Sequence, residues 1–65
     1  MREIIYAVNA DIEVVENILF DNFITPLDIY AINRYPFELV VHIDPKDDAE
    51  FKRVLHDNYI GFEWV

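Results

Sequence analysis

The fold of this chain is decided by two similar stretches, Leu19-Phe20-Asp21-Asn22-Phe23-Ile24 and Leu55-His56-Asp57-Asn58-Tyr59-Ile60, which lie 36 positions apart. The same offset aligns Ile-Ile-Tyr-Ala-Val at residues 4–8 with Val-Val-His-Ile-Asp at residues 40–44, and no gap is needed between the two matches. A repeat at a fixed period indicates two copies of one supersecondary unit. The architecture therefore follows from the structure expected for a single copy.

Each copy is expected to form a strand, a helix and a second strand. Alternating or β-branched residues place the strands at 3–8, 27–34, 37–43 and 60–65, and apolar residues at helical spacing place the helices at 11–23 and 45–58. Two such units, about 3–33 and 39–65, give one α+β domain over 1–65 with the ferredoxin-like βαββαβ arrangement. We expect a four-stranded antiparallel sheet in the order 4-1-3-2, with both helices on one face. Strands 1 and 3 are expected to be its one parallel pair.

The helix ends carry local signals. Asp44 precedes Pro45, which favours a helix start because proline has no N–H to leave unpaired in the first turn. Both helices end in Asp-Asn-aromatic-Ile, so we expect Asn22 and Asn58 to adopt left-handed geometry, with the aromatic residue packing back on the helix. Phe20 falls on the polar face of its helix, and we expect it to be exposed.

Composition restricts the possible partners. The chain has 13 acidic and 5 basic residues, a net charge of −8, and no cysteine. Binding to nucleic acid or to an acidic membrane requires basic side chains that displace counterions, so direct contact with either is disfavoured. The opposite expectation follows for a basic protein, including one that normally holds nucleic acid. No export signal is evident, so we expect a cytoplasmic protein.

The residues available for chemistry are few. The chain has no Ser and no Cys, and its single Thr, Thr25, precedes a proline, so we expect no catalytic nucleophile and no enzymatic activity. The single glycine, Gly61, is too little for a glycine-rich phosphate loop, and we expect no cofactor. A hard-cation site at Asp44, Asp47, Asp48 and Glu50 is one alternative, but helix capping explains these residues equally, and we expect no metal.

The two central strands are apolar on both faces, although the helices can cover only one. We place Ile5, Ala7, Leu39, Val41 and Ile43 under the helices. That choice leaves a second, open face that something else should cover. The simplest cover is a second copy of the chain, so we expect a homodimer through an interface that comprises Ile4, Tyr6, Val8, Val40 and His42.

The leading functional hypothesis is a small, non-enzymatic protein that binds or inhibits a basic partner, of the kind that phages or mobile elements encode. Its expected contact surface is acidic and consists of Glu13, Glu16, Asp21, Asp47, Asp48 and Glu50. Two alternatives stay open: a dimeric regulatory domain that senses a small ligand, and a metal-dependent, nuclease-like enzyme. The position of the carboxylates distinguishes the binding protein from the ligand-sensing domain. Binding a basic surface favours a continuous acidic stripe, whereas sensing favours a polar-lined pocket.

Overall fold

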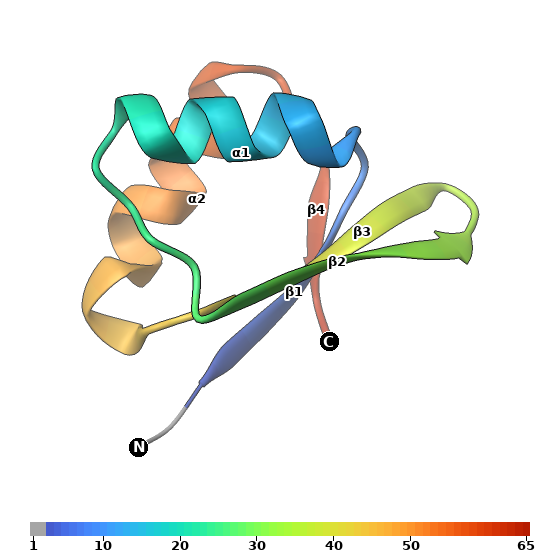
Figure 1. Ribbon diagram of the computed structural model, residues 1–65, viewed down its shortest axis with the longest axis horizontal. Helices are drawn as coiled ribbons and strands as arrows, with labels where there is room; N and C mark the ends of the chain where they lie inside the picture. Colours follow the sequence, from blue (N-terminus) through green and yellow to red (C-terminus); the bar gives the residue numbers. More distant parts are fainter. Residues whose placement is uncertain (1–2) are drawn as a thin grey trace.

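The computed structural model describes residues 3–65 and confirms the ferredoxin-like α+β fold. Four strands form one sheet, and the two α-helices lie on the same side of it (Figure 1). In chain order the elements are β1 (Ile4–Val8), α1 (Ile12–Asp21), β2 (Asp28–Arg34), β3 (Phe37–Ile43), a 3₁₀ turn η1 (Pro45–Asp47), α2 (Asp48–Asp57) and β4 (Phe62–Trp64). Each expected element is present, and the ends differ from expectation by a few residues.

The strand order is β2-β3-β1-β4, which is the expected order read from the opposite edge. The expected parallel pairing of the central strands was wrong. β1 and β3 are antiparallel, with Tyr6 opposite Val41 and Val8 opposite Leu39. The reason is chain direction: the crossover through α1 returns the chain so that β2 runs with β1, and the hairpin at Tyr35-Pro36 then reverses β3 against both.

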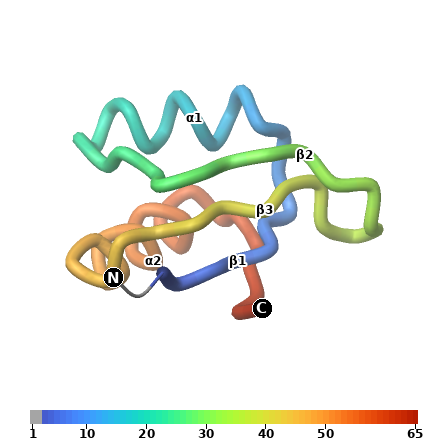
Figure 2. The backbone as a smooth tube through the Cα atoms, turned by 60° about the horizontal axis from the view of Figure 1, so that its bottom comes forward, coloured from blue at the N-terminus to red at the C-terminus, as the bar shows by residue number. Residues whose placement is uncertain are grey.

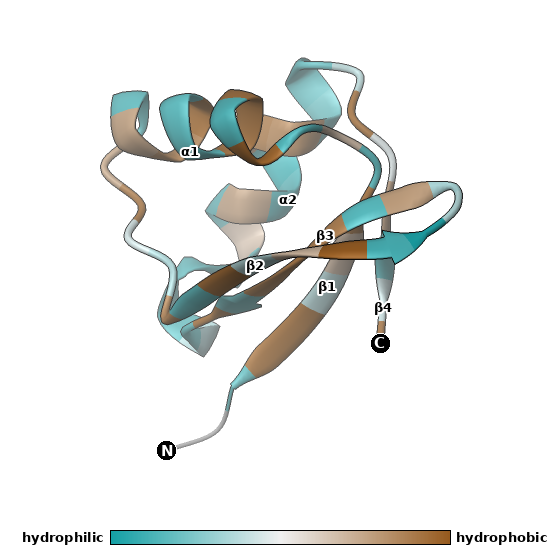
Figure 3. Cartoon of the chain, turned by 45° about the vertical axis from the view of Figure 1, so that its right-hand side comes forward, coloured by the Kyte–Doolittle hydropathy of each residue, from teal (hydrophilic) through white to brown (hydrophobic). Residues whose placement is uncertain are grey.

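The core lies between the helices and one face of the sheet. The backbone tube in Figure 2 shows the strands as a layer beside the two helices. Val15 and Leu19 of α1 and Phe51, Val54 and Leu55 of α2 are buried against the sheet. The strands contribute Tyr6, Val8, Leu39, Val41 and Ile43, and Ile24 is buried just after α1. In Figure 3, brown and teal alternate around α1, as expected for a helix that buries one face.

The faces of β1 were assigned incorrectly from the sequence. Ile4, Tyr6 and Val8 belong to the core side, so they do not lie on the open face where the sequence placed them. Ile5 and Ala7 take the open face instead, opposite His42 and Val40. A shift of one residue in a strand exchanges its two faces, and residues 4–8 are apolar in both phases. The assignment of Val40 and His42 to the open face agrees with the structure.

The start of the second helical segment is capped as expected. The Asp44 carboxylate accepts a hydrogen bond of 3.0 Å from the Lys46 amide, and Pro45 occupies the first position. The capped turn is a 3₁₀ turn, after which α2 proper begins at Asp48. At the first helix, Asp11 occupies the N-cap position but makes no capping hydrogen bond with its side chain.

Both helices end in the same Schellman motif, although not with the residues expected. The left-handed residues are Phe23 (φ 58°) and Tyr59 (φ 59°), one position after each asparagine. The Ile24 amide donates to the Leu19 carbonyl at 2.9 Å, and Ile60 repeats that bond to Leu55 at 3.0 Å. The side-chain amides of Asn22 and Asn58 donate instead to the carbonyls of Ile18 and Val54, four residues back. The two aromatic side chains do not pack back, because they are 95% and 97% exposed.

Candidate protein-binding surface

The outer face of α1 combines carboxylates with exposed apolar side chains. Val15 and Leu19 point into the core and Ile18 packs partly against it, so the other side of the helix is directed to solvent. Phe20 is 69% exposed, which confirms the expectation for this residue, and Val14 is also exposed. Three carboxylates share this solvent side. We define the α1 face as Glu13, Glu16, Phe20, Asp21 and Phe23.

The carboxylates of the α1 face have no neutralising partner within residues 3–65. No Lys or Arg occurs between positions 3 and 33, although this stretch holds six acidic residues. The ion pairs of the described chain involve Glu3 with His42 and the acidic residues from Asp47 onward; none involves Glu13, Glu16 or Asp21. Their negative charge is therefore available to a partner.

The other half of the expected acidic surface has a different environment. Asp47 lies 3.3 Å from Lys46 and Asp48 lies 3.0 Å from Lys52. Glu50 lies 2.6 Å from the Arg53 guanidinium, which lowers the pKa of Glu50 through a hydrogen bond that outweighs the small effect of burial. Arg53 also contacts Asp57 at 2.8 Å. The structure thus divides the predicted surface into an unpaired set on α1 and a neutralised set at η1 and α2.

Asp48 also has a structural contact that the sequence did not predict. The Tyr6 hydroxyl, from the central strand β1, donates a hydrogen bond to its carboxylate. Burial raises the pKa of Tyr6 to about 12, with help from the hydrogen bond and the charge of Asp48. Burial alone would raise the pKa of Asp48, but the hydrogen bonds from Tyr6 and Lys52 and the Lys52 charge together lower it. Asp48 therefore supports the fold.

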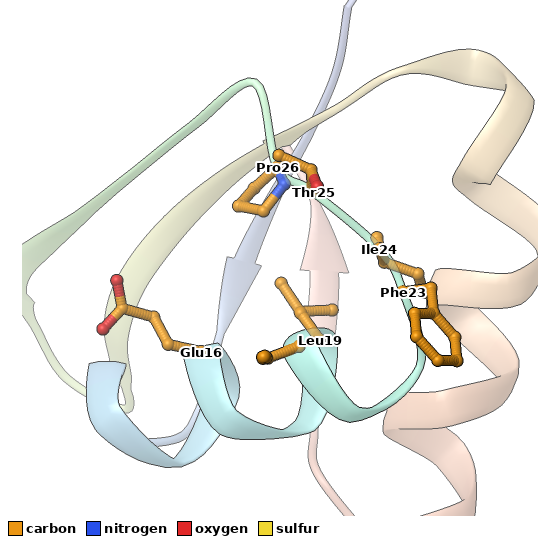
Figure 4. Close-up of a pocket in the computed structure, with 7 residues that line it drawn as sticks. Glu16, Leu19, Phe23, Ile24, Thr25 and Pro26 are labelled. Carbon is orange, nitrogen blue, oxygen red and sulfur yellow. The ribbon is translucent and has the colours of Figure 1, made fainter.

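A groove lies beside the α1 face. It has a volume of about 380 Å³ and runs between the last turns of α1 and the segment 23–26 (Figure 4). Glu16 and Phe20 line it from the helix, and Phe23 and Pro26 line it from the connecting segment. An apolar groove with a carboxylate among its lining residues fits a side chain that is apolar along its length and positively charged at its end, as in Lys or Arg.

Phe23 combines left-handed backbone geometry with an almost fully exposed ring. Left-handed geometry costs a non-glycine residue roughly 1–2 kcal/mol, and glycine is the common residue at this position of the motif. The exposed ring recovers little of that cost by packing within the chain. Tyr59 has the same geometry and exposure, so what distinguishes Phe23 is its place in the lining of the groove beside the α1 face, where its exposed ring is available to a partner. Sequence reasoning missed it because the motif was expected to bury the ring.

The open sheet face carries a short polar chain. The Nδ1 atom of His42 lies 3.2 Å from a Glu3 oxygen, and its Nε2 atom lies 3.3 Å from the Tyr30 hydroxyl. Ala7 and Val40, at the centre of this face, are each only 8% exposed in the single chain. The predicted homodimer through this face stays a prediction, and the apolar area that these two residues offer is small.

Two further features of the described chain bear on the expectations. Within residues 3–65, no three His, Cys, Asp or Glu side chains are placed to hold a metal ion together. Over the same range, neither helix has the length and apolar character that crossing a bilayer requires. No protein-family model, curated protein or solved structure matches the chain.

Proposed function

We propose that this protein binds a basic protein partner through the α1 face and that it acts by occupying the partner's surface rather than by catalysis. The observation that carries the proposal is the absence of neutralising cations around Glu13, Glu16 and Asp21 within residues 3–65, on a helix face that also exposes Phe20. Exposed carboxylates accelerate and orient association with a positive surface, whereas an aromatic anchor contributes most to the affinity.

A partner surface that normally holds nucleic acid fits this chemistry best. Such a surface presents Lys and Arg to phosphates, and carboxylates spaced along a helix can take the place of those phosphates. The groove beside Phe20 and Phe23 would accept one of these long basic side chains along its stem. Inhibition of nucleic-acid binding by direct competition is the activity that this arrangement supports.

The experiment compares capture of host proteins by the wild type and by two charge-reversed variants. The α1 variant is a triple change that removes the unpaired set: Glu13→Lys, Glu16→Lys and Asp21→Lys. Asp47→Lys with Glu50→Lys and Asp57→Lys changes the net charge equally but alters carboxylates that already have partners. We expect the α1 variant to lose the partner and the control to retain it. Equal loss from both variants would show that net charge alone matters and would contradict a specific α1 face.

The purified partner then allows a separation of charge from anchoring. We expect association with the wild type to slow steeply as salt rises, because interactions between exposed charges more than about 8 Å apart are largely screened at physiological ionic strength. Phe20→Ala should mainly accelerate dissociation, with an affinity loss of about tenfold or more for an aromatic anchor. Binding that is insensitive to salt and unaffected by either the α1 charge reversal or Phe20→Ala would overturn the proposal.

A further inference from the structure

β4 is an edge strand that leaves two residues free to pair. It lies last in the sheet and pairs only with β1 within residues 3–65. The Val65 amide donates to the Ile5 carbonyl at 3.0 Å, and the Asn9 amide donates to the Gly61 carbonyl at 2.8 Å. Backbone direction alternates along an antiparallel strand, so Phe62 and Trp64 direct their N–H and C=O groups away from β1. An edge of this kind is a template for another extended chain.

A cavity lies directly beside this edge. It has a volume of about 430 Å³, and its apolar lining comes from Ile4, Phe62 and Trp64. Tyr6, Asp48 and Lys52 complete the lining, but their polar atoms are already engaged with one another. The register sets Trp64 opposite Tyr6 and Phe62 opposite Val8, on the helix side of the sheet. The Trp64 side chain is nevertheless 77% exposed, so much of its ring is available to a ligand.

The charge around the edge selects the ligand. A second cavity of about 330 Å³ shares Ile4 and Trp64 with the first and is lined by Glu3 and Pro45. Alternate residues of an extended chain lie on one side, about 6.5–7 Å apart. β4 runs toward the Glu3 end of β1, so a strand antiparallel to β4 runs away from Glu3. Such a strand could place an apolar side chain in the first cavity, opposite Trp64, and a basic side chain, two positions earlier, near Glu3. A second copy of this chain fits poorly, because its net charge of −8 would oppose an identical charge.

We propose that the outer edge of β4 binds an extended, basic peptide segment by antiparallel strand addition, with an apolar side chain in the 430 Å³ cavity and Lys or Arg two residues before it. The main-chain groups of Phe62 and Trp64 supply the hydrogen bonds, and the cavity supplies the side-chain preference. This surface differs from the α1 face, so the two proposals can fail separately.

The probe is the peptide acetyl-Lys-Thr-Lys-Thr-Leu-Thr-Lys-Thr-amide. Trp64 is the single tryptophan of the chain, so its fluorescence reports on the cavity directly. We expect the peptide to shift the Trp64 emission to shorter wavelength and to slow amide hydrogen exchange at Phe62 and Trp64. Leu→Ala in the peptide should weaken binding by about tenfold or more, because it removes most of the apolar side chain. A peptide N-methylated at Leu and at the following Lys should lose binding, because these N–H groups would face β4.

Variants of the protein separate the proposal from its rivals. Trp64→Ser should lose affinity for a fluorescently labelled peptide. Glu3→Lys should weaken peptide binding by removing the contact with the basic side chain, and circular dichroism should show that the fold is intact. Phe23→Gly, which alters the α1 face alone, should bind the peptide as the wild type does. Unchanged exchange at Phe62 and Trp64 in saturating peptide would overturn the proposal. So would concentration-dependent protection of the same amides without peptide, because the occupant would then be a second copy.

Discussion

Replacing Tyr6 by Phe should destabilise the protein at neutral pH and remove a specific loss of stability at alkaline pH. The ring would keep its packing, because Tyr6 stacks on Phe51 at a centroid distance of 5.2 Å and meets the edge of Phe62 at 5.5 Å. What is lost is the hydroxyl that donates to Asp48. The variant therefore isolates one hydrogen bond between the sheet and α2.

The size of the neutral-pH effect follows from the surroundings of Asp48. A hydrogen bond to a charged group contributes roughly 1.5–3 kcal/mol, and the Asp48 side chain, which is 20% exposed, keeps Lys52 and gains access to water. We therefore expect a loss of about 1–2 kcal/mol. For a domain of this size, a loss of 1 kcal/mol lowers the melting temperature by about 4–8 °C.

The alkaline effect follows from the pKa. Folding raises the pKa of Tyr6 from 10.0 to about 12, so the stabilisation is fully present below pH 10 and is lost as the pH rises through 12. Two pKa units correspond to roughly 2.7 kcal/mol. The wild type should lose about this free energy of unfolding between pH 10 and 12 because of Tyr6, whereas the variant should not. The two stability curves should therefore converge or cross.

The assay is urea unfolding followed by far-ultraviolet circular dichroism at a series of pH values. Tyr59→Phe is the matched control, since its side chain is 97% exposed and makes no hydrogen bond within residues 3–65. The control should follow the wild type at every pH. A Tyr6→Phe variant that is as stable as the wild type at pH 7, or that keeps a constant difference from it up to pH 12, would refute the reasoning.

Asp44→Ala should lower the free energy of unfolding by about 0.5–2 kcal/mol, whereas Asp44→Asn should nearly preserve it, because asparagine also caps helices; chemical denaturation distinguishes the two. Phe23→Gly and Tyr59→Gly should each raise the free energy of unfolding by about 0.5–1 kcal/mol, because glycine relieves the left-handed strain. Only Phe23→Gly should weaken partner binding, and similar binding by both variants would contradict the role given to Phe23. Because Asp48 has a lowered pKa, its stabilisation is present above its ordinary pKa of 3.8 and is lost as the pH falls through the lower, folded value; acid unfolding should therefore begin at higher pH in Tyr6→Phe. Val40→Arg should shift the mass measured by light scattering if the open sheet face forms the predicted homodimer, and an unchanged monomer mass in both proteins would contradict that dimer.

The repeat made the order of elements predictable, because each copy carries its own helix stripe and flanking strands. The phase of β1 was not predictable in the same way: residues 4–8 are apolar at every position, so alternation could not show whether Tyr6 or Ala7 faces the core. Volume decides between them, since the larger Tyr6 and Val8 fill the core and the small Ala7 is left on the open face. The expected parallel pairing of β1 and β3 could have been avoided. The predicted order of elements already required β3 to run antiparallel to β1.

The candidate site was partly predictable. The spacing of Lys52 from Asp48, and of Arg53 from Glu50 and Asp57, is three or four residues on one helix, which is enough to indicate that these carboxylates are neutralised. α1 contains no basic residue, so its carboxylates have no cation three or four residues away, and the sequence alone was enough to separate them from those of α2. The Tyr6–Asp48 contact had no such signal, because its partners lie 42 positions apart and meet only when α2 packs on the sheet.

The unequal distribution of cations between the two repeats has a consequence for how the molecule approaches another. Between residues 3 and 65 all the Lys and Arg side chains lie in the second half, at Arg34, Lys46, Lys52 and Arg53, while residues 3–33 carry six acidic side chains and no Lys or Arg. Between residues 3 and 65 the first half has a formal charge of −6 and the second half, with seven acidic residues, a charge of −3, so the negative charge is unevenly distributed over the molecule. In the field of a positively charged body it should experience a torque as well as an attraction, which turns α1 forward before contact. The need to find the correct orientation normally slows the docking of two specific patches. The unequal distribution of cations between the two repeats would shorten that rotational search.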